Sequence, residues 1–211
     1  MGRVRAMARP RSTAADSAIL DATRATLVEL GWPKLTMGHV AARAGVAKTT
    51  LYRRWPSKSA LVVDAVAILF DELELPDRGS LRGDIEGVVG SFATLLERPE
   101  TKTSLMAVVA ESTRDPALRV HIREAIVQRQ KHLVQEGRDR AQRRGELTSA
   151  PHPGTAARQV DLIFDVIAGA VVHRALVSAE PVDGAWTTMF TELLLGGLSS
   201  LDEASDSASA Y

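Results

Sequence analysis

Two short helices and a turn are indicated by residues 35–61, which read LTMGHVAARAGVAKTTLYRRWPSKSAL. Thr36 stands where an N-cap belongs, and Gly45 is a usual helix C-terminal residue, so the first helix is expected to run between them. A second short helix is expected over residues 47–53, because Pro56 forces the chain to leave helical geometry just before it. This arrangement predicts a helix-turn-helix.

A supporting helix is expected before this motif, since apolar residues recur at helical spacing from Ile19 to Leu30 and are followed by Gly31. The second short helix would turn apolar side chains toward a small core, namely Val46, Leu51 and Trp55. Its outer face would then carry Lys48, Thr49, Tyr52 and Arg53. Donors and amphipathic rings of this kind suit phosphates and base edges, so binding in the major groove of DNA is favoured over a plain polar surface.

The charges of the chain are unevenly distributed. The formal net charge of the 211 residues is zero, but residues 1–63 hold eleven Lys and Arg against three Asp and Glu, a net charge of +8. The remaining residues therefore carry −8. A basic head on an acidic body predicts that the N-terminal part alone binds a polyanion.

The remainder of the chain is expected to be helical. Helical patterns bounded by Pro, Gly and Asp are found at 57–71, 81–97, 101–113, 116–144, 155–178 and 184–198. The stretch 128–144 is highly charged and is expected to be a solvated helical end, and 145–154 is expected to be a loop. The predicted fold is all-α with about nine helices, divided into a flexible basic arm (1–11), a helix-turn-helix domain (12–58), a regulatory and dimerisation domain (59–200) and a disordered tail (201–211).

Residues 35–61, together with the helix before them, resemble the DNA-binding signature of TetR-family transcriptional regulators. The resemblance implies a homodimer that binds double-stranded operator DNA and responds to a small molecule. It implies base contacts from Lys48, Thr49 and Tyr52 with Arg53 as a further candidate, and phosphate contacts from Thr36, Thr50, Arg54 and Lys58. Two positions depart from the family pattern: Ala47 replaces a frequent capping hydroxyl residue, and Thr49 replaces a common Gly.

A dimer interface is predicted near the C-terminus. Apolar residues cover nearly all sides of the helix at 160–176, so this helix needs burial on two faces, one of which a partner can supply. The residues assigned to the interface are Ile163, Ile167, Val171, Met189, Phe190, Leu193, Leu194 and Leu198. The alternative is that the same residues form the core of a monomer.

A ligand cavity is predicted between the helices of the body, for a small and largely apolar effector. Its candidate lining residues are Phe92, Leu96, Met106, Val109 and Phe164, with polar contacts from His173 or Arg174. Apolar residues of this kind are more often ordinary core, because Met and aromatic side chains mostly fill space. A regulator of the same fold that is controlled by a protein partner is the alternative.

Enzymatic function and membrane insertion are not indicated. The histidines form no metal-binding spacing, the chain has no Cys, and no phosphate-binding Gly loop or nucleophile elbow occurs, so no metal, cofactor or catalytic residue is expected. The Arg-rich N-terminus leads into no apolar segment, and the longest apolar runs are too short to span a bilayer. A cytoplasmic protein is therefore expected.

Overall fold

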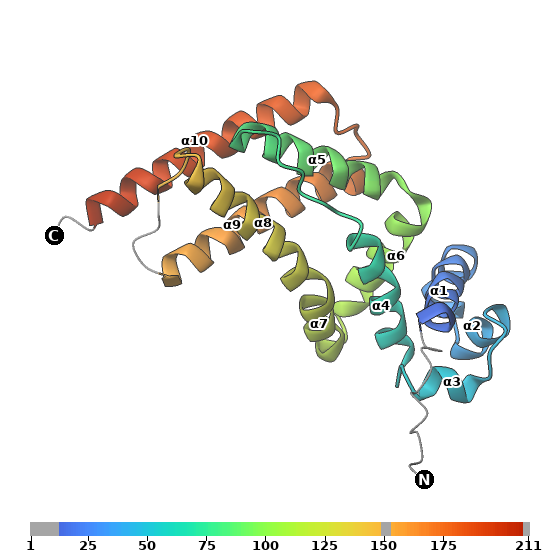
Figure 1. Ribbon diagram of the computed structural model, residues 1–211. Helices are drawn as coiled ribbons and strands as arrows, with labels where there is room; N and C mark the ends of the chain where they lie inside the picture. Colours follow the sequence, from blue (N-terminus) through green and yellow to red (C-terminus); the bar gives the residue numbers. More distant parts are fainter. Residues whose placement is uncertain (1–12, 149–152, 209–211) are drawn as a thin grey trace, which may run out of the picture.

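The computed structural model describes residues 13–148 and 153–208 and is helical throughout (Figure 1). Within these ranges it has ten α-helices, two π-helical turns and no strand, which confirms the all-α prediction. The expected basic arm and part of the expected loop at 145–154 lie outside the described residues. We call helices α1–α3 the head and helices α5–α10 the body; α4 joins the two.

Single residues at the helix ends determine where the helices of the head begin and end. They are α1 (Thr13–Lys34), α2 (Met37–Arg43) and α3 (Lys48–Tyr52). Gly31 interrupts α1 with a φ of 71°, a left-handed conformation that only Gly adopts at little cost, so the regular helix ends where the sequence predicts. The Thr36 hydroxyl accepts a hydrogen bond from the His39 N–H at 3.2 Å and caps α2.

The apolar side chains inside the head are deeply buried and belong to a core that continues into the body. Ile19, Leu27, Val40 and Leu51 are completely buried, and Trp55 is nearly so. The two buried hydroxyls of α1 donate to carbonyl oxygens one turn earlier, Thr23 to Ile19 at 2.8 Å and Thr26 to Ala22 at 2.6 Å. Each buried hydroxyl is therefore hydrogen-bonded within the helix, as buried polar groups usually are.

Helix α4 (Lys58–Phe70) connects the head to the body. Ser57 caps it by accepting from the Ala60 N–H at 3.1 Å. The helix packs against α1, α6 and α7, and most of its residues are buried; α1 and α6 also pack directly against each other. Asp64 in its middle accepts a hydrogen bond from Trp55 Nε1 at 2.8 Å and lies 2.9 Å from His121 Nε2, so one carboxylate contacts both parts of the molecule.

The body continues the apolar core of the head. Its elements are α5 (Leu81–Glu97), α6 (Pro99–Ser112), α7 (Pro116–Ile122), η1 (Arg123–Val127), α8 (Gln128–Arg143), α9 (Pro153–Val172), η2 (His173–Val177) and α10 (Gly184–Ala208). Helix α5 packs against α8, α9 and α10, and α8 packs against α9. Figure 1 shows the body extending away from the head, with α10 reaching the far end.

Three expectations about the body need correction. The single helix expected at 116–144 is divided by the π-helical turn η1, and the helix expected at 155–178 ends in a second such turn, η2. The tail expected to be disordered from residue 201 continues α10 as far as Ala208, since Ser and Ala are compatible with an existing helix; residues 209–211 lie outside the described part. The stretch 128–144 is not a solvated end, because Gln130, Gly137, Arg138 and Ala141 are buried on one face of α8.

None of the helices in the described ranges is both long and apolar enough to cross a membrane.

Candidate DNA-binding surface and ligand cavity

The outer face of α3 carries the side chains that the sequence predicts for contact with bases. Lys48, Thr49, Tyr52 and Arg53 are exposed, and the Tyr52 ring is exposed to 54%. Thr50 is half-buried at the edge of this face. Ala47 occupies the N-cap position without a side-chain hydrogen bond, so the N-terminal N–H groups of α3 have no cap from this residue.

Lys48 lies across the first turn of α2. A Cβ atom at Gly38 would come within 2.9 Å of Lys48 Cε and 3.1 Å of Lys48 Nζ. Glycine at this position therefore allows the lysine to approach the start of α2, close to the Thr36 cap. The two short helices thus present a cationic group and a helix N-terminus on the same side of the head, an arrangement that favours anions.

Two side chains that are predicted to bind DNA phosphates contact α1 and the residues just after its kink. Arg54 forms an ion pair with Asp16. Lys58 Nζ donates to the Trp32 carbonyl oxygen at 3.0 Å and lies 4.8 Å from the centre of the Trp32 ring. Both side chains therefore stabilise the packing of the head, a role that the sequence did not reveal.

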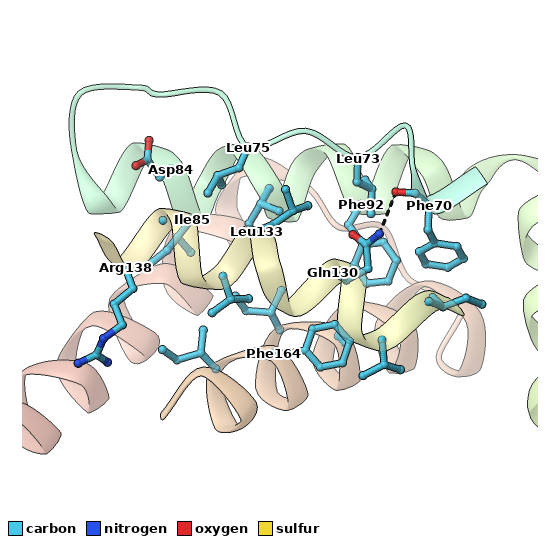
Figure 2. Close-up of a pocket in the computed structure, with 18 of the residues that line it drawn as sticks. Phe70, Leu73, Leu75, Asp84, Ile85, Phe92, Gln130, Leu133, Arg138 and Phe164 are labelled. Atoms are coloured by element: carbon cyan, nitrogen blue, oxygen red, sulfur yellow. Dashed lines mark hydrogen bonds between the residues drawn. The ribbon is translucent and has the colours of Figure 1, made fainter. Parts of the chain in front are cut away.

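The body contains an apolar cavity of about 260 Å³, lined mainly by α5, α8 and α9 (Figure 2). Phe92, Val109 and Phe164 line it, as the sequence predicts. Val109 is also half exposed, so the wall reaches the surface at α6. Figure 2 shows the lining side chains as a long row between Phe70 at one end and Arg138 at the other.

Four predicted ligand contacts lie elsewhere. Leu96 is buried in the core on another face of α5, and Met106 is on the solvent side of α6. His173 is exposed, 3.4 Å from the Ser178 hydroxyl. Arg174 pairs with Glu180 at 2.7 Å and lies over the Trp186 ring. These residues were assigned from residue type, whereas the rotation of each helix decides which side chains face the cavity.

The polar groups of the cavity were not predicted. Asp84, Gln130 and Arg138 line it and are almost fully buried. Gln130 Nε2 donates to the carbonyl oxygen of Phe70, the last residue of α4, at 3.0 Å (Figure 2). The sequence did indicate that one face of this helix is buried. Small and apolar residues recur at helical spacing through the charged stretch, namely Leu133, Val134, Gly137 and Ala141.

Asp84 is held by a network centred on Arg144. The guanidinium donates to Asp84 Oδ2 at 2.8 Å, to Asp77 Oδ1 at 2.9 Å and to Glu146 Oε2 at 2.7 Å. The hydrogen bond to Asp84, followed by that to Glu146, raises the pKa of Arg144 above its ordinary value. The pKa of Asp77 is lowered, mainly by the hydrogen bond from the Gly79 N–H and further by Arg144. The network fixes the loop between α4 and α5 to the end of α8.

The predicted interface residues divide into two groups. Six face the interior of the protomer: Ile163, Val171, Phe190, Leu194 and Leu198 are buried and Ile167 is half-buried. Met189 and Leu193 on α10 are 65% and 75% exposed. On α9 the exposed apolar side chains are Leu162 and Val166, which the sequence analysis did not assign to the interface. The outer faces of α9 and α10 are thus apolar at i, i+4 spacing.

The head is a helix-turn-helix whose second short helix is exposed, and it is carried on a helical body with an internal cavity. This is the architecture of a DNA-binding transcriptional regulator. Residues 19–65 match the model of bacterial regulatory proteins of the tetR family, and residues 75–194 match the model of the tetracyclin repressor-like C-terminal domain. The chain belongs to the TetR family of transcriptional regulators and is not an enzyme.

Individual relatives agree with this assignment. The chain is 30% identical over 167 residues to the uncharacterized HTH-type transcriptional regulator Rv1556 of Mycobacterium tuberculosis, covering 79% of this chain and 78% of the relative. The crystal structure of the TetR family regulator SCO0332 superposes with a TM-score of 0.69 at 30% identity and covers 87% of this chain and 97% of its own. FadR from Bacillus subtilis in complex with stearoyl-CoA has a TM-score of 0.61 at 18% identity, covers 86% and 98%, and shares the fold.

Proposed function

We propose that this protein is a cytoplasmic, ligand-responsive repressor that acts as a homodimer on a two-fold symmetric operator. Residues 12–58 would form the DNA-binding domain and residues 59–200 the regulatory and dimerisation domain. The observation that carries the proposal is the course of α4, which begins beside the DNA-binding surface at Lys58 and ends in the cavity wall at Phe70.

In this proposal α3 enters the major groove and reads bases with Lys48, Thr49 and Tyr52, with Arg53 beside them. Their exposure supports this role. Thr36, Thr50, Arg54 and Lys58 would contact phosphates. For Arg54 and Lys58 a phosphate competes with Asp16 and with the Trp32 carbonyl, so their contribution to DNA binding should be smaller than that of Lys48.

Dimerisation through the outer faces of α9 and α10 would bury Leu162, Val166, Met189 and Leu193. Apolar side chains that recur at i, i+4 on two helices form faces suited to helix packing between subunits. Gly169, Gly196 and Gly197 have open space around them, which permits close approach of a partner helix. A two-fold dimer presents two copies of α3 in opposite directions and requires a symmetric operator.

Ligand response would operate through α4. Phe70 lines the cavity and its carbonyl oxygen accepts from Gln130, so a ligand that displaces either residue also moves the end of α4. A shift of α4 would alter the spacing of the two heads. The ligand can do this only by binding more tightly to the conformation that does not fit DNA.

The cavity favours a small-molecule effector over control by a protein partner, which would need no internal space. That FadR was crystallised with stearoyl-CoA supports the use of this fold for ligands that carry a long apolar chain. The proposed effector is small and largely apolar, because the cavity is near the lower limit of ligand sites, which span roughly 300–1,000 Å³.

Footprinting on the DNA upstream of the protein's own gene tests the proposal. We expect a palindromic site, bound with a strong dependence on salt. Thr49→Ala should change the preference at one position of each half-site by about 1 kcal/mol, with the salt dependence preserved. The control is Lys102→Ala, an exposed lysine on α6 that should change neither property. An asymmetric single site, or affinity indifferent to salt, would contradict the proposal.

The dual contacts of Lys58 can be separated in the same assay. If Lys58 binds phosphate, Lys58→Ala reduces the salt dependence by about one contact per half-site. If it serves only the head, the variant lowers the melting temperature and leaves the salt dependence unchanged.

A further inference from the structure

A buried arginine lies at one end of the ligand cavity. Arg138 on α8 is only 4% exposed and is one of the residues that line the cavity; it lies at the end opposite Phe70, where its guanidinium extends beyond the row of apolar lining side chains (Figure 2). Its Nη2 atom is shielded from solvent and has no hydrogen-bond partner in the described part of the chain. A guanidinium stays charged at any pH that proteins tolerate, so burying its Nη2 atom without a hydrogen-bond partner costs stability.

The other charged group in the wall does not compensate Arg138. Among the described lining residues Arg138 is the sole cation and Asp84 the sole anion. Asp84 points away from the cavity in Figure 2 and accepts hydrogen bonds from the Arg78 N–H and from Arg144, both at 2.8 Å. Arg138 is therefore the one charge in this wall whose partner can be a ligand.

We propose that the effector is a monocarboxylic acid with an elongated apolar chain, whose carboxylate binds Arg138 and whose chain extends toward Phe92 and Phe70. This inference rests on the proposed ligand response and specifies its chemistry. A carboxylate matches the guanidinium fork with two parallel hydrogen bonds and neutralises its single charge. A phosphate monoester carries more negative charge than this one cation compensates.

The shape and polarity of the cavity agree with such a ligand. Apart from Asp84, Gln130 and Arg138, its lining is apolar, and Gln130 Nε2 already donates to Phe70. The lining side chains form a long row between α5, α8 and α9, with the cation at one end (Figure 2). An amphipathic acid would bury its chain along this row and satisfy the otherwise unpaired charge.

Calorimetric titration of the full-length protein with three probes of equal chain length, decanoate, decanol and decyl phosphate, tests the proposal. The variants are Arg138→Met, which keeps an unbranched stem without charge, and Arg143→Met, an exposed control on the same helix. Wild type and the control should bind decanoate more tightly than the other probes. Arg138→Met should lose at least about tenfold in decanoate affinity and keep its affinity for decanol within about twofold.

Melting temperatures without ligand provide an independent check. Removing an unpaired buried charge should leave the melting temperature of Arg138→Met equal to or above that of wild type. A marked decrease would show that Arg138 has a partner within the protein and would overturn the inference. Decanol or decyl phosphate binding wild type as tightly as decanoate would overturn it too.

The outcome is separable from that of the proposed function. If decanoate binds through Arg138 but does not release the operator, the carboxylate assignment is supported and the ligand response fails. If a neutral ligand releases the operator in both wild type and Arg138→Met, the response is supported and the carboxylate assignment fails.

Discussion

The head and the body differ in how many of their buried polar side chains have hydrogen-bond partners. In the head, the hydroxyls of Thr23 and Thr26 donate within α1, and the Trp55 indole donates to Asp64. In the body, the buried side-chain atoms without a hydrogen-bond partner among the described residues belong to Thr101, Ser104, Arg138, Arg140, Gln159 and Thr191. The apolar side chains inside the head are also deeply buried, whereas the body encloses a cavity and exposes apolar side chains.

This contrast separates a part of fixed shape from a part that can adapt. Reading bases requires side chains held in one geometry, which full packing and satisfied hydrogen bonds provide. A cavity and unsatisfied groups cost stability, but they leave interactions that a ligand or a second subunit can complete. Four predictions test this contrast.

The largest effect is expected at the outer face of α10. Met189→Glu combined with Leu193→Glu would place carboxylates in the proposed interface and weaken dimerisation by at least about a hundredfold, giving monomers of normal helicity. Light scattering and circular dichroism measure both properties. Met106→Glu, at an exposed apolar position of α6, serves as the control. A double variant that stays dimeric would remove α10 from the interface.

In the head, Leu51→Ala removes a completely buried side chain from α3. The cavity that it leaves should lower the free energy of unfolding by about 2–5 kcal/mol. Urea denaturation gives this value. Leu133→Ala in the body should cost less, since Leu133 already borders empty space. Equal losses at the two positions would argue against this difference between the head and the body.

Enlarging a side chain should likewise cost more stability in the head than in the body. Val40→Phe overpacks the head and should cost about 1–3 kcal/mol, because Val40 is completely buried among well-packed neighbours. Val134→Phe can place its ring in the body cavity and should be nearly neutral. It should also reduce ligand affinity by occupying the site. Comparable destabilisation in both variants would show that the cavity does not accept the ring.

The smallest effect concerns the cap of α2. Thr36→Ala deletes the hydrogen bond to the His39 N–H and should lower the stability by about 1 kcal/mol. Thr36→Ser keeps the acceptor and should preserve it. If both variants have the melting temperature of wild type, the cap does not contribute to the stability of the head.

The sequence predicts the head well because its signals are local. Thr36, Gly31 and Pro56 determine where helices begin and end through their own backbone preferences, and the resulting helix phase places Leu51 inside and Tyr52 outside. The prediction of the helices in the head needed no residue outside the head.

The cavity is harder to predict because it depends on how distant helices rotate against one another. Met106 and Val109 are three residues apart on α6, yet only Val109 lines the cavity. Arg138 escaped notice because a charged residue in a charged stretch suggests solvent, although the stripe around it indicates burial. The exposure of the predicted interface residues depends on the same rotation, since the neighbours Ile163 and Leu162 are buried and exposed respectively.

The hydrogen bond between Trp55 and Asp64 gives the molecule an intrinsic optical reporter. Of its three tryptophans, Trp32 lies beneath Lys58 and Trp55 donates to α4, whereas Trp186 stacks on Phe190 within α10 of the body. Indole emission changes with the polarity and hydrogen bonding around the ring. Movement of α4 would therefore alter the fluorescence of the two indoles at its start. The chain has no cysteine, so a single introduced thiol could carry an acceptor dye, and the separation of the heads could be followed in solution by energy transfer.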